Sequence, residues 1–171
     1  RLNDVLMIGH KGDFVLVQSG HNDEKNGKDN GVVSDPTARF GTGSTEEMYR
    51  NYLENSYISA IKARGMIPVL VTPMTRVKGD AEEGYVYADT FTTEDRQFTK
   101  VMRETAKDNN VPLVDLNADS VKYLNELGVK GATAVVMSIE AGETPAKSNS
   151  GSYANGHPQL KIDGTHMKEA L

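Results

Sequence analysis

One short motif near the N-terminus combines residues that can stabilise negative charge on an oxygen atom. It is Gly20-His21-Asn22-Asp23, and it directly follows an apolar run. The glycine lets the backbone turn sharply, after which the side-chain amide of Asn22 can donate a hydrogen bond to an oxyanion that develops during a reaction. The alternative is an Asx-turn with no chemical role, because Asn and Asp are common turn formers.

A second motif, near the C-terminus, pairs a carboxylate with an imidazole. It is Asp163-Gly164-Thr165-His166. An Asp three residues before a His can accept the Nδ1–H of the ring, which fixes the tautomer and leaves Nε2 available as a general base. The alternative is an Asp that caps a helix N-terminus beside an unrelated surface His. Pairs with this spacing are common by chance, so the motif needs support from the rest of the chain.

Three short apolar runs predict the strands that position these motifs. Their β-branched residues are typical of strands buried on both faces of a sheet, and they lie near residues 14–19, 67–72 and 112–116. Helical patterns separate the runs, and this alternation predicts βαβ units and a parallel sheet. Because ligands bind beyond the carboxyl ends of strands in open α/β sheets, we expect Asn22 and His166 to lie at the same edge of the sheet.

Capping residues and glycines predict where the helices begin and end. Ser44-x-x-Glu47 is a capping box, and Gly65 is expected to end the helix that it opens. Thr92 or Thr93 is expected to cap a second helix, and a third helix is expected to end at Gly128. The polar segments between these elements are expected to be loops, at residues 22–43, 76–92 and 141–162.

The composition is mildly acidic and contains no cysteine. The 171 residues have a formal net charge of −5 and a pI of about 5.4, whereas a nucleic-acid groove needs clustered Lys and Arg. Without cysteine there are no disulfides and no thiol chemistry, and the four His residues show no zinc-ligand spacing. No apolar run reaches the length of a membrane span. We therefore expect one domain with no metal, no cofactor, and neither nucleic acid nor membrane as a partner.

The two motifs and two strand phrases between them occur in the order found in one enzyme superfamily. Between the first and the second motif lie Ile67-Pro-Val-Leu-Val-Thr-Pro-Met-Thr-Arg76 and Val114-Asp-Leu-Asn117. The chain thereby resembles the SGNH, or GDSL-like, hydrolases and most closely the rhamnogalacturonan acetylesterase group. The resemblance implies a flavodoxin-like three-layer α/β/α sandwich with a parallel sheet. It also implies serine chemistry, without metal, that removes acetyl groups from pectic polysaccharide.

The same resemblance implies catalytic roles for three residues. Asn22 matches the side-chain donor of the oxyanion hole, and Asp163 and His166 match the Asp and His of the catalytic triad. In this interpretation a serine attacks the acetyl carbonyl, His166 relays the proton and Asn22 helps to hold the oxyanion.

Four further residues are candidates for shaping the site or binding the substrate. Gly20, His21 and Asp23 match positions of the loop around the oxyanion donor, and a structural role for His21 is an equal alternative. Arg76 follows the second strand on the rim where substrate is expected to bind. Its guanidinium can pair with a galacturonate carboxylate, and a solvated surface arginine is the alternative.

Two sequence blocks of the superfamily are absent from this chain. They are the Gly-Asp-Ser block that supplies the nucleophile and a later Gly that supplies a backbone oxyanion donor; Ser19, one residue before the donor loop, lacks the matching context. We expect both blocks and the N-terminal strands to precede Arg1, and the domain to be incomplete at both ends. We accordingly expect residues 1–171 alone to be inactive and the full-length protein to be a carbohydrate acetylesterase.

The sequence leaves two other functions open. The same fold and mechanism serve other esters, such as acetylxylan, aryl esters or lysophospholipids, whereas a non-catalytic carbohydrate-binding fragment is a different class of protein. A Gly-Asp-Ser block on the same polypeptide would exclude the non-catalytic alternative. The expected partner is an acetylated polysaccharide or oligosaccharide. The expected location is secreted or at the cell surface, with the cytoplasm as the alternative.

Overall fold

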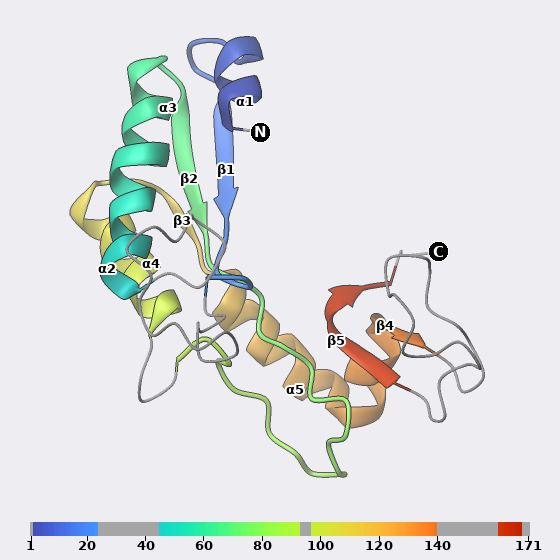
Figure 1. Cartoon of the computed structure of the whole chain (residues 1–171). Helices are drawn as coiled ribbons and strands as arrows, with labels where there is room; N and C mark the ends of the chain where they lie inside the picture. Colours follow the sequence, from blue (N-terminus) through green and yellow to red (C-terminus); the bar gives the residue numbers. More distant parts are fainter. Residues whose placement is uncertain (1, 24–44, 93–96, 140–160, 169–171) are drawn as a thin grey trace, which may run out of the picture. The chain divides into compact units, whose positions relative to one another are not determined.

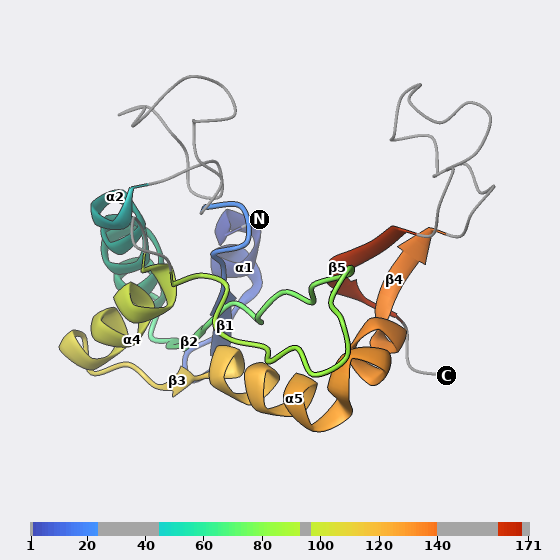
Figure 2. The same cartoon turned by 90° about the horizontal axis from the view of Figure 1, so that it is seen from below.

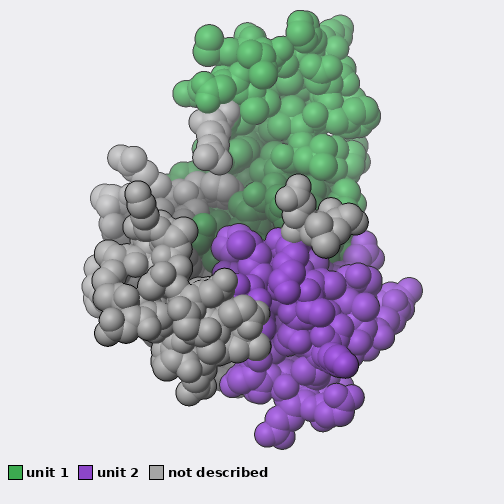
Figure 3. Space-filling model, turned by 90° about the vertical axis from the view of Figure 1, so that its right-hand side faces the viewer, with its two compact units in different colours: residues 1–74, 90–118 green, residues 75–89, 119–171 purple. Residues whose placement is uncertain are grey.

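The computed structural model describes residues 2–23, 45–92, 97–139 and 161–168 (Figure 1). The chain divides into two units, which Figure 3 distinguishes by colour. Unit 1 comprises Arg1–Met74 and Thr90–Ala118, and unit 2 comprises Thr75–Asp89 and Asp119–Leu171.

Unit 1 contains a sheet of three parallel strands. The strands are β1 (Phe14–Gln18), β2 (Ile67–Val71) and β3 (Leu113–Val114), and they pair in the order β1-β2-β3. Consecutive strands that lie side by side in parallel require crossover connections, and helices supply them here. The three predicted strands and the α/β fold with a parallel sheet are thereby confirmed, although β3 is shorter than its apolar run. Burial on both faces is wrong for β1, because Phe14 and Leu16 are each 67% exposed.

One long helix connects β1 to β2. It consists of α2 (Glu46–Asn51), a π-helical turn η2 (Tyr52–Ile58) and α3 (Ser59–Ala63). The prediction of the N-cap was wrong by one residue: Ser44 lies outside the described residues, and the Oγ1 of Thr45 accepts from the Met48 N–H at 3.1 Å. The helix ends as predicted, because Gly65 follows it with a φ of +73° that favours glycine.

Helix α4 (Phe98–Asp108) connects the second and third strands of unit 1. Its start differs from the prediction: Gln97 occupies the N-cap position, Thr92 instead forms an isolated bridge with Gln97, and Thr93 lies outside the described residues. Figure 2 shows α2 and α4 on the same side of the three strands. The helices and strands share a core that includes Val17, Tyr49, Leu53, Ile58, Ile61, Leu70, Phe98, Val101 and Met102.

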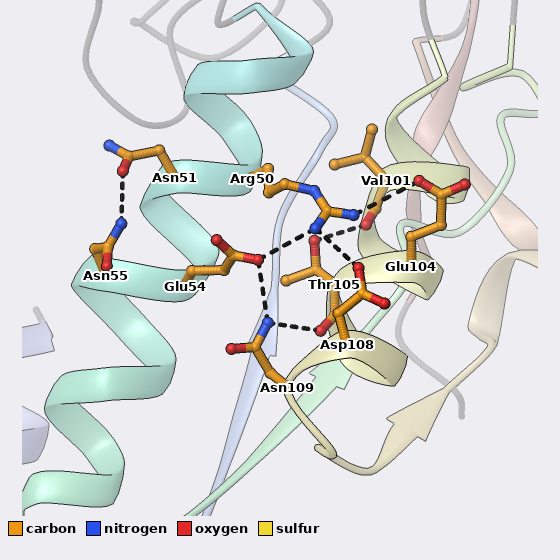
Figure 4. Close-up of polar contacts among 9 residues, drawn as sticks. All are labelled: Arg50, Asn51, Glu54, Asn55, Val101, Glu104, Thr105, Asp108 and Asn109. Carbon is orange, nitrogen blue, oxygen red and sulfur yellow. Dashed lines mark hydrogen bonds and ion pairs between the residues drawn. The ribbon is translucent and has the colours of Figure 1, made fainter.

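An ion-pair network joins the long helix of unit 1 to α4 (Figure 4). The guanidinium of Arg50 lies 3.3 Å from Glu54 on its own helix, and 3.6 Å from Glu104 and 3.0 Å from Asp108 on α4. The side-chain amide of Asn109 donates to the same Glu54 carboxylate at 3.1 Å. These charges are partly exposed, so the network orients the two helices rather than providing most of the folding free energy.

Unit 2 contains most of helix α5 and a two-stranded antiparallel ribbon. Helix α5 (Leu116–Val135) breaks at Gly128, whose φ and ψ are 67° and 177°, and this confirms the predicted stop. The ribbon pairs β4 (Val136–Ile139) with β5 (Lys161–Met167). The ribbon corrects the loop prediction at residues 161–162, which belong to β5 together with the second motif. Among the described helices, none has the length and apolar character needed to cross a membrane.

The segment from Thr75 to Asp89 has no regular structure and lies along α5 (Figures 1 and 2). The side-chain amide of Asn125 replaces a strand partner, because it accepts from the Tyr87 N–H at 2.8 Å and donates to the Tyr87 carbonyl at 2.9 Å. The N–H of Thr75 donates to the Ser120 hydroxyl at 2.9 Å. A small core lies beneath these contacts, formed by Val77, Tyr87, Leu124, Ala132 and Val136.

Candidate active site

The loop that holds Asn22 follows β1 directly and depends on one glycine. Gly20 is buried with a φ of +127°, and a Cβ added there would lie 2.7 Å from Cγ of Pro73. Its N–H donates to the Asp23 carboxylate at 3.1 Å, and Asp23 is 1% exposed. The sharp turn therefore forms as predicted, and it leaves Asn22 exposed at the carboxyl end of the strand.

His21 and Ser19, on either side of this glycine, make packing contacts within unit 1. The ring of His21 is half-buried and lies edge-on to Phe91, with ring centroids 4.8 Å apart. The hydroxyl of Ser19 lies 3.2 Å from the hydroxyl of Tyr49, whose burial raises its pKa well above the usual value. Ser19 therefore contacts a group that stays protonated, not a general base. A structural role for His21 agrees with its contact, and a substrate role stays a prediction.

The second motif forms a hydrogen-bonded turn within β5. Nδ1 of His166 lies 2.8 Å from Oδ1 of Asp163, which is the contact expected from the sequence. The same carboxylate oxygen accepts from the backbone N–H groups of Thr165 at 2.9 Å and His166 at 2.6 Å. In the tautomer that donates from Nδ1, the lone pair of His166 is on Nε2, as a general base requires. The catalytic role of each residue stays a prediction.

The electrostatics of Asp163 favour its ionised form. Partial burial raises the pKa of Asp163, but the N–H groups of His166 and Thr165, together with the His166 ring, outweigh burial and hold the pKa below the usual value. The side chains of Asp163 and His166 are 37% and 70% exposed. At neutral pH the carboxylate is therefore charged and can stabilise an imidazolium form of His166.

Arg76 contacts the second motif rather than open solvent alone. Its Nη1 donates to the Thr165 hydroxyl at 2.6 Å, and Arg76 is half-buried. The next residue, Val77, donates its N–H to the Gly164 carbonyl at 2.8 Å. Thr165 was not a candidate from the sequence, because a contact between residues 89 positions apart leaves no local signal.

The structure therefore brings some of the candidate residues together within each unit. Unit 2 holds Arg76, Asp163 and His166, and unit 1 holds the four residues of the first motif. Because Asn22 and His166 belong to different units, their predicted proximity stays a prediction. Within the described ranges, no group of three or more His, Asp or Glu side chains is placed to hold a metal ion.

Comparison with known proteins identifies the family. The family model described as "GDSL-like Lipase/Acylhydrolase" matches residues 3–170. The Bacillus subtilis (strain 168) protein named "Probable rhamnogalacturonan acetylesterase YesY" is 29% identical over 128 residues, which cover 75% of this chain and 51% of that protein. The chain thus spans about half the length of this curated relative.

A solved structure shows the same fold. The crystal structure of protein YXIM from Bacillus subtilis matches with a TM-score of 0.59 and 23% sequence identity, over 80% of this chain and 33% of that one. The parallel sheet of unit 1 agrees with the SGNH hydrolase fold. The chain belongs to the GDSL-like lipase/acylhydrolase family, in the SGNH hydrolase superfamily and close to the rhamnogalacturonan acetylesterase group.

Proposed function

We propose that this protein is a serine esterase that removes O-acetyl groups from a carbohydrate, namely a pectic polysaccharide such as rhamnogalacturonan. The contact of 2.8 Å between Asp163 and His166 is the observation on which the proposal depends. A contact of this kind orients the general base in a catalytic triad, and the family to which the chain belongs consists of hydrolases.

In the proposed mechanism, Nε2 of His166 takes the proton as the serine Oγ attacks the acetyl carbonyl carbon. Asp163 stabilises the resulting imidazolium, and the Asn22 amide donates to the oxyanion of the tetrahedral intermediate. The intermediate collapses, the C–O bond to the sugar breaks, and His166 returns the proton to the departing hydroxyl. Water then attacks the acetyl-enzyme by the same route, which releases acetate and restores the serine.

The nucleophile in this proposal comes from a Gly-Asp-Ser block upstream of Arg1. The printed sequence contains no Gly-Asp-Ser, and the chain matches about half of its curated relative. Residues 1–171 alone are therefore proposed to be inactive, while the full-length protein turns over substrate.

The name of the curated relative supports acetylated rhamnogalacturonan as the substrate class. A polymer of this kind does not cross a membrane, so we infer that the protein acts outside the cell, either secreted or at the cell surface. Comparing activity on intact cells with activity in the culture medium and in lysate tests this location.

The test is acetate release by the full-length protein from a panel of esters. The panel contains acetylated rhamnogalacturonan, acetylated xylan, p-nitrophenyl acetate and a lysophospholipid. We expect the highest kcat/KM on acetylated rhamnogalacturonan and its loss in His166→Ala. The matched control is His10→Ala, because His10 is also exposed and also lies near an Asp three residues away, at 3.7 Å from Asp13.

Three outcomes would contradict the proposal. Higher kcat/KM on another ester would overturn the substrate class and leave the mechanism intact. Activity unchanged in His166→Ala would overturn the mechanism. Saturable binding of the polysaccharide with no acetate release would make the protein a carbohydrate-binding module.

A further inference from the structure

Three contacts join the segment after β2 to β5, and all lie within unit 2. Arg76 donates to the Thr165 hydroxyl at 2.6 Å, and Val77 donates to the Gly164 carbonyl at 2.8 Å. A Cβ added at Gly79 would lie 2.7 Å from Cβ of Ile162, so the two backbones are in close contact there. The segment therefore contacts β5 on both sides of Asp163.

From these contacts we propose that Arg76 is a positioning residue for the Asp163–His166 pair, not a ligand of the substrate carboxylate. The inference rests on the proposed function, because it assumes that this pair is the catalytic base. Thr165 lies between the two residues, and its own N–H donates to Asp163 at 2.9 Å. A restraint on the Thr165 side chain therefore also restrains the turn in which the Asp163 carboxylate contacts the His166 imidazole.

The two side chains of the pair need such a restraint because little packs against them directly. The side chains of Asp163 and His166 are 37% and 70% exposed, and of the four motif residues only Gly164 is buried. A hydrogen bond from a charged donor is shorter and stronger than one between neutral groups, and here the charged donor Nη1 of Arg76 lies 2.6 Å from the Thr165 hydroxyl. Catalysis is sensitive to displacements of about 1 Å, so the orientation of the turn decides how well Nε2 meets the serine.

The first experiment compares two substrates in the full-length protein. The variants are Arg76→Gln, Arg76→Lys and Thr165→Val, with Lys78→Gln as the control. Lys78 lies in the same segment and carries the same charge, but its ammonium lies over the Tyr85 ring, 5.2 Å from the centroid. The substrates are p-nitrophenyl acetate, which has no carboxylate, and acetylated rhamnogalacturonan, which has one in each galacturonate unit.

If Arg76 positions the pair, Arg76→Gln and Thr165→Val each lower kcat by about 10- to 100-fold on both substrates, with little change in KM. The double variant loses no more activity than the worse single variant, because both substitutions remove the same hydrogen bond. Arg76→Lys recovers part of the rate, and Lys78→Gln keeps it. A rise in KM confined to the galacturonate polymer, with Thr165→Val unaffected, would instead show that Arg76 binds the substrate.

The second experiment measures amide hydrogen exchange in the peptide that covers residues 161–168 of the intact protein. The Thr165 and His166 amides are expected to exchange faster in Arg76→Gln and Thr165→Val, and at the wild-type rate in Lys78→Gln. Unchanged exchange in both variants would overturn the inference. This readout needs no substrate, so it separates a failure of the inference from a failure of the proposed function, which His166→Ala reports.

Discussion

The donor loop of unit 1 (Gly20–Asp23) and the Asp–His turn of unit 2 (Asp163–His166) are held in place by different forces. In the donor loop, Gly20 and Asp23 are buried and His21 packs against Phe91. In the turn, the exposed carboxylate of Asp163 accepts hydrogen bonds from two backbone N–H groups and from the imidazole ring. Arg76 donates a hydrogen bond to the neighbouring Thr165 hydroxyl. One loop is fixed by packing, and the other is fixed by hydrogen bonds at the surface.

This difference has a functional consequence. Packing holds a backbone turn rigid while the exposed Asn22 contributes only its amide, so a change at Asn22 should leave the turn intact. In the turn of unit 2 the groups that would do the chemistry also hold its shape. Substitutions in this turn should therefore lower activity and local order together, and the local order of the turn should depend on pH.

The largest effect is expected for Asp163→Asn in the full-length protein. The amide cannot stabilise an imidazolium and favours the wrong tautomer of His166, so kcat should fall by about 10⁴-fold. The measurement is steady-state hydrolysis of p-nitrophenyl acetate, with Asp13→Asn as the control because Asp13 lies beside His10 in the same spacing. An equal loss in the Asp13 variant would show that the assignment of the pair is wrong.

A smaller loss is expected for Asn22→Ala. Removing one side-chain donor from an oxyanion hole costs about 100- to 1000-fold in kcat, with a modest change in KM. Because Asn22 is exposed, the free energy of unfolding should change by less than about 0.5 kcal/mol. If activity is kept, the Asx-turn is the correct interpretation of Asn22 and the oxyanion donor lies elsewhere.

The packing of the donor loop can be tested through Gly20→Ala. Both the φ of +127° and the contact with Pro73 oppose a Cβ, so the free energy of unfolding should fall by about 1–3 kcal/mol. Gly12→Ala is the matched control, since Gly12 has a φ of +94° but no atom within 4 Å of an added Cβ. Equal losses in the two variants would mean that backbone strain alone, without the contact, accounts for the effect.

The smallest effect is a local response of unit 2 to acid. The pKa of Asp163 is below its usual value in the folded protein, so its ionisation stabilises the turn above the unfolded pKa of about 3.9. That contribution is lost as the pH falls through the lower, folded pKa. Amide protection of Thr165 and His166 should therefore decrease below about pH 4, and Asp163→Asn should remove this dependence. A decrease of the same size in the variant would contradict the account.

The elements that the sequence predicted correctly are those determined by nearby residues. The β-branched runs at residues 14–19 and 67–72 form β1 and β2, and Gly65 and Gly128 end helices because the chain needs a positive φ there. The start of the long helix was wrong by only one residue, since Ser44 and Thr45 are both good caps.

The missed features depend on partners that are distant in the sequence. Strand β5, with the sequence KIDGTHM, has no regular apolar alternation and forms because it pairs with residues 136–139. The contact between Arg76 and Thr165 likewise joins segments 89 positions apart. The sequence therefore identified Asp163 and His166 as a pair, and only the structure showed what holds them.

Activation of a serine by His166 is tested most directly by phosphonylation of that serine. The full-length protein is incubated with a fluorophosphonate, and the labelled peptide is identified by mass spectrometry. We predict stoichiometric labelling of one serine outside residues 1–171, and labelling at least about 10³-fold slower in His166→Ala. Residues 1–171 alone should not be labelled. Labelling at Ser19 or another serine of this chain, or labelling at the same rate in His166→Ala, would contradict the account.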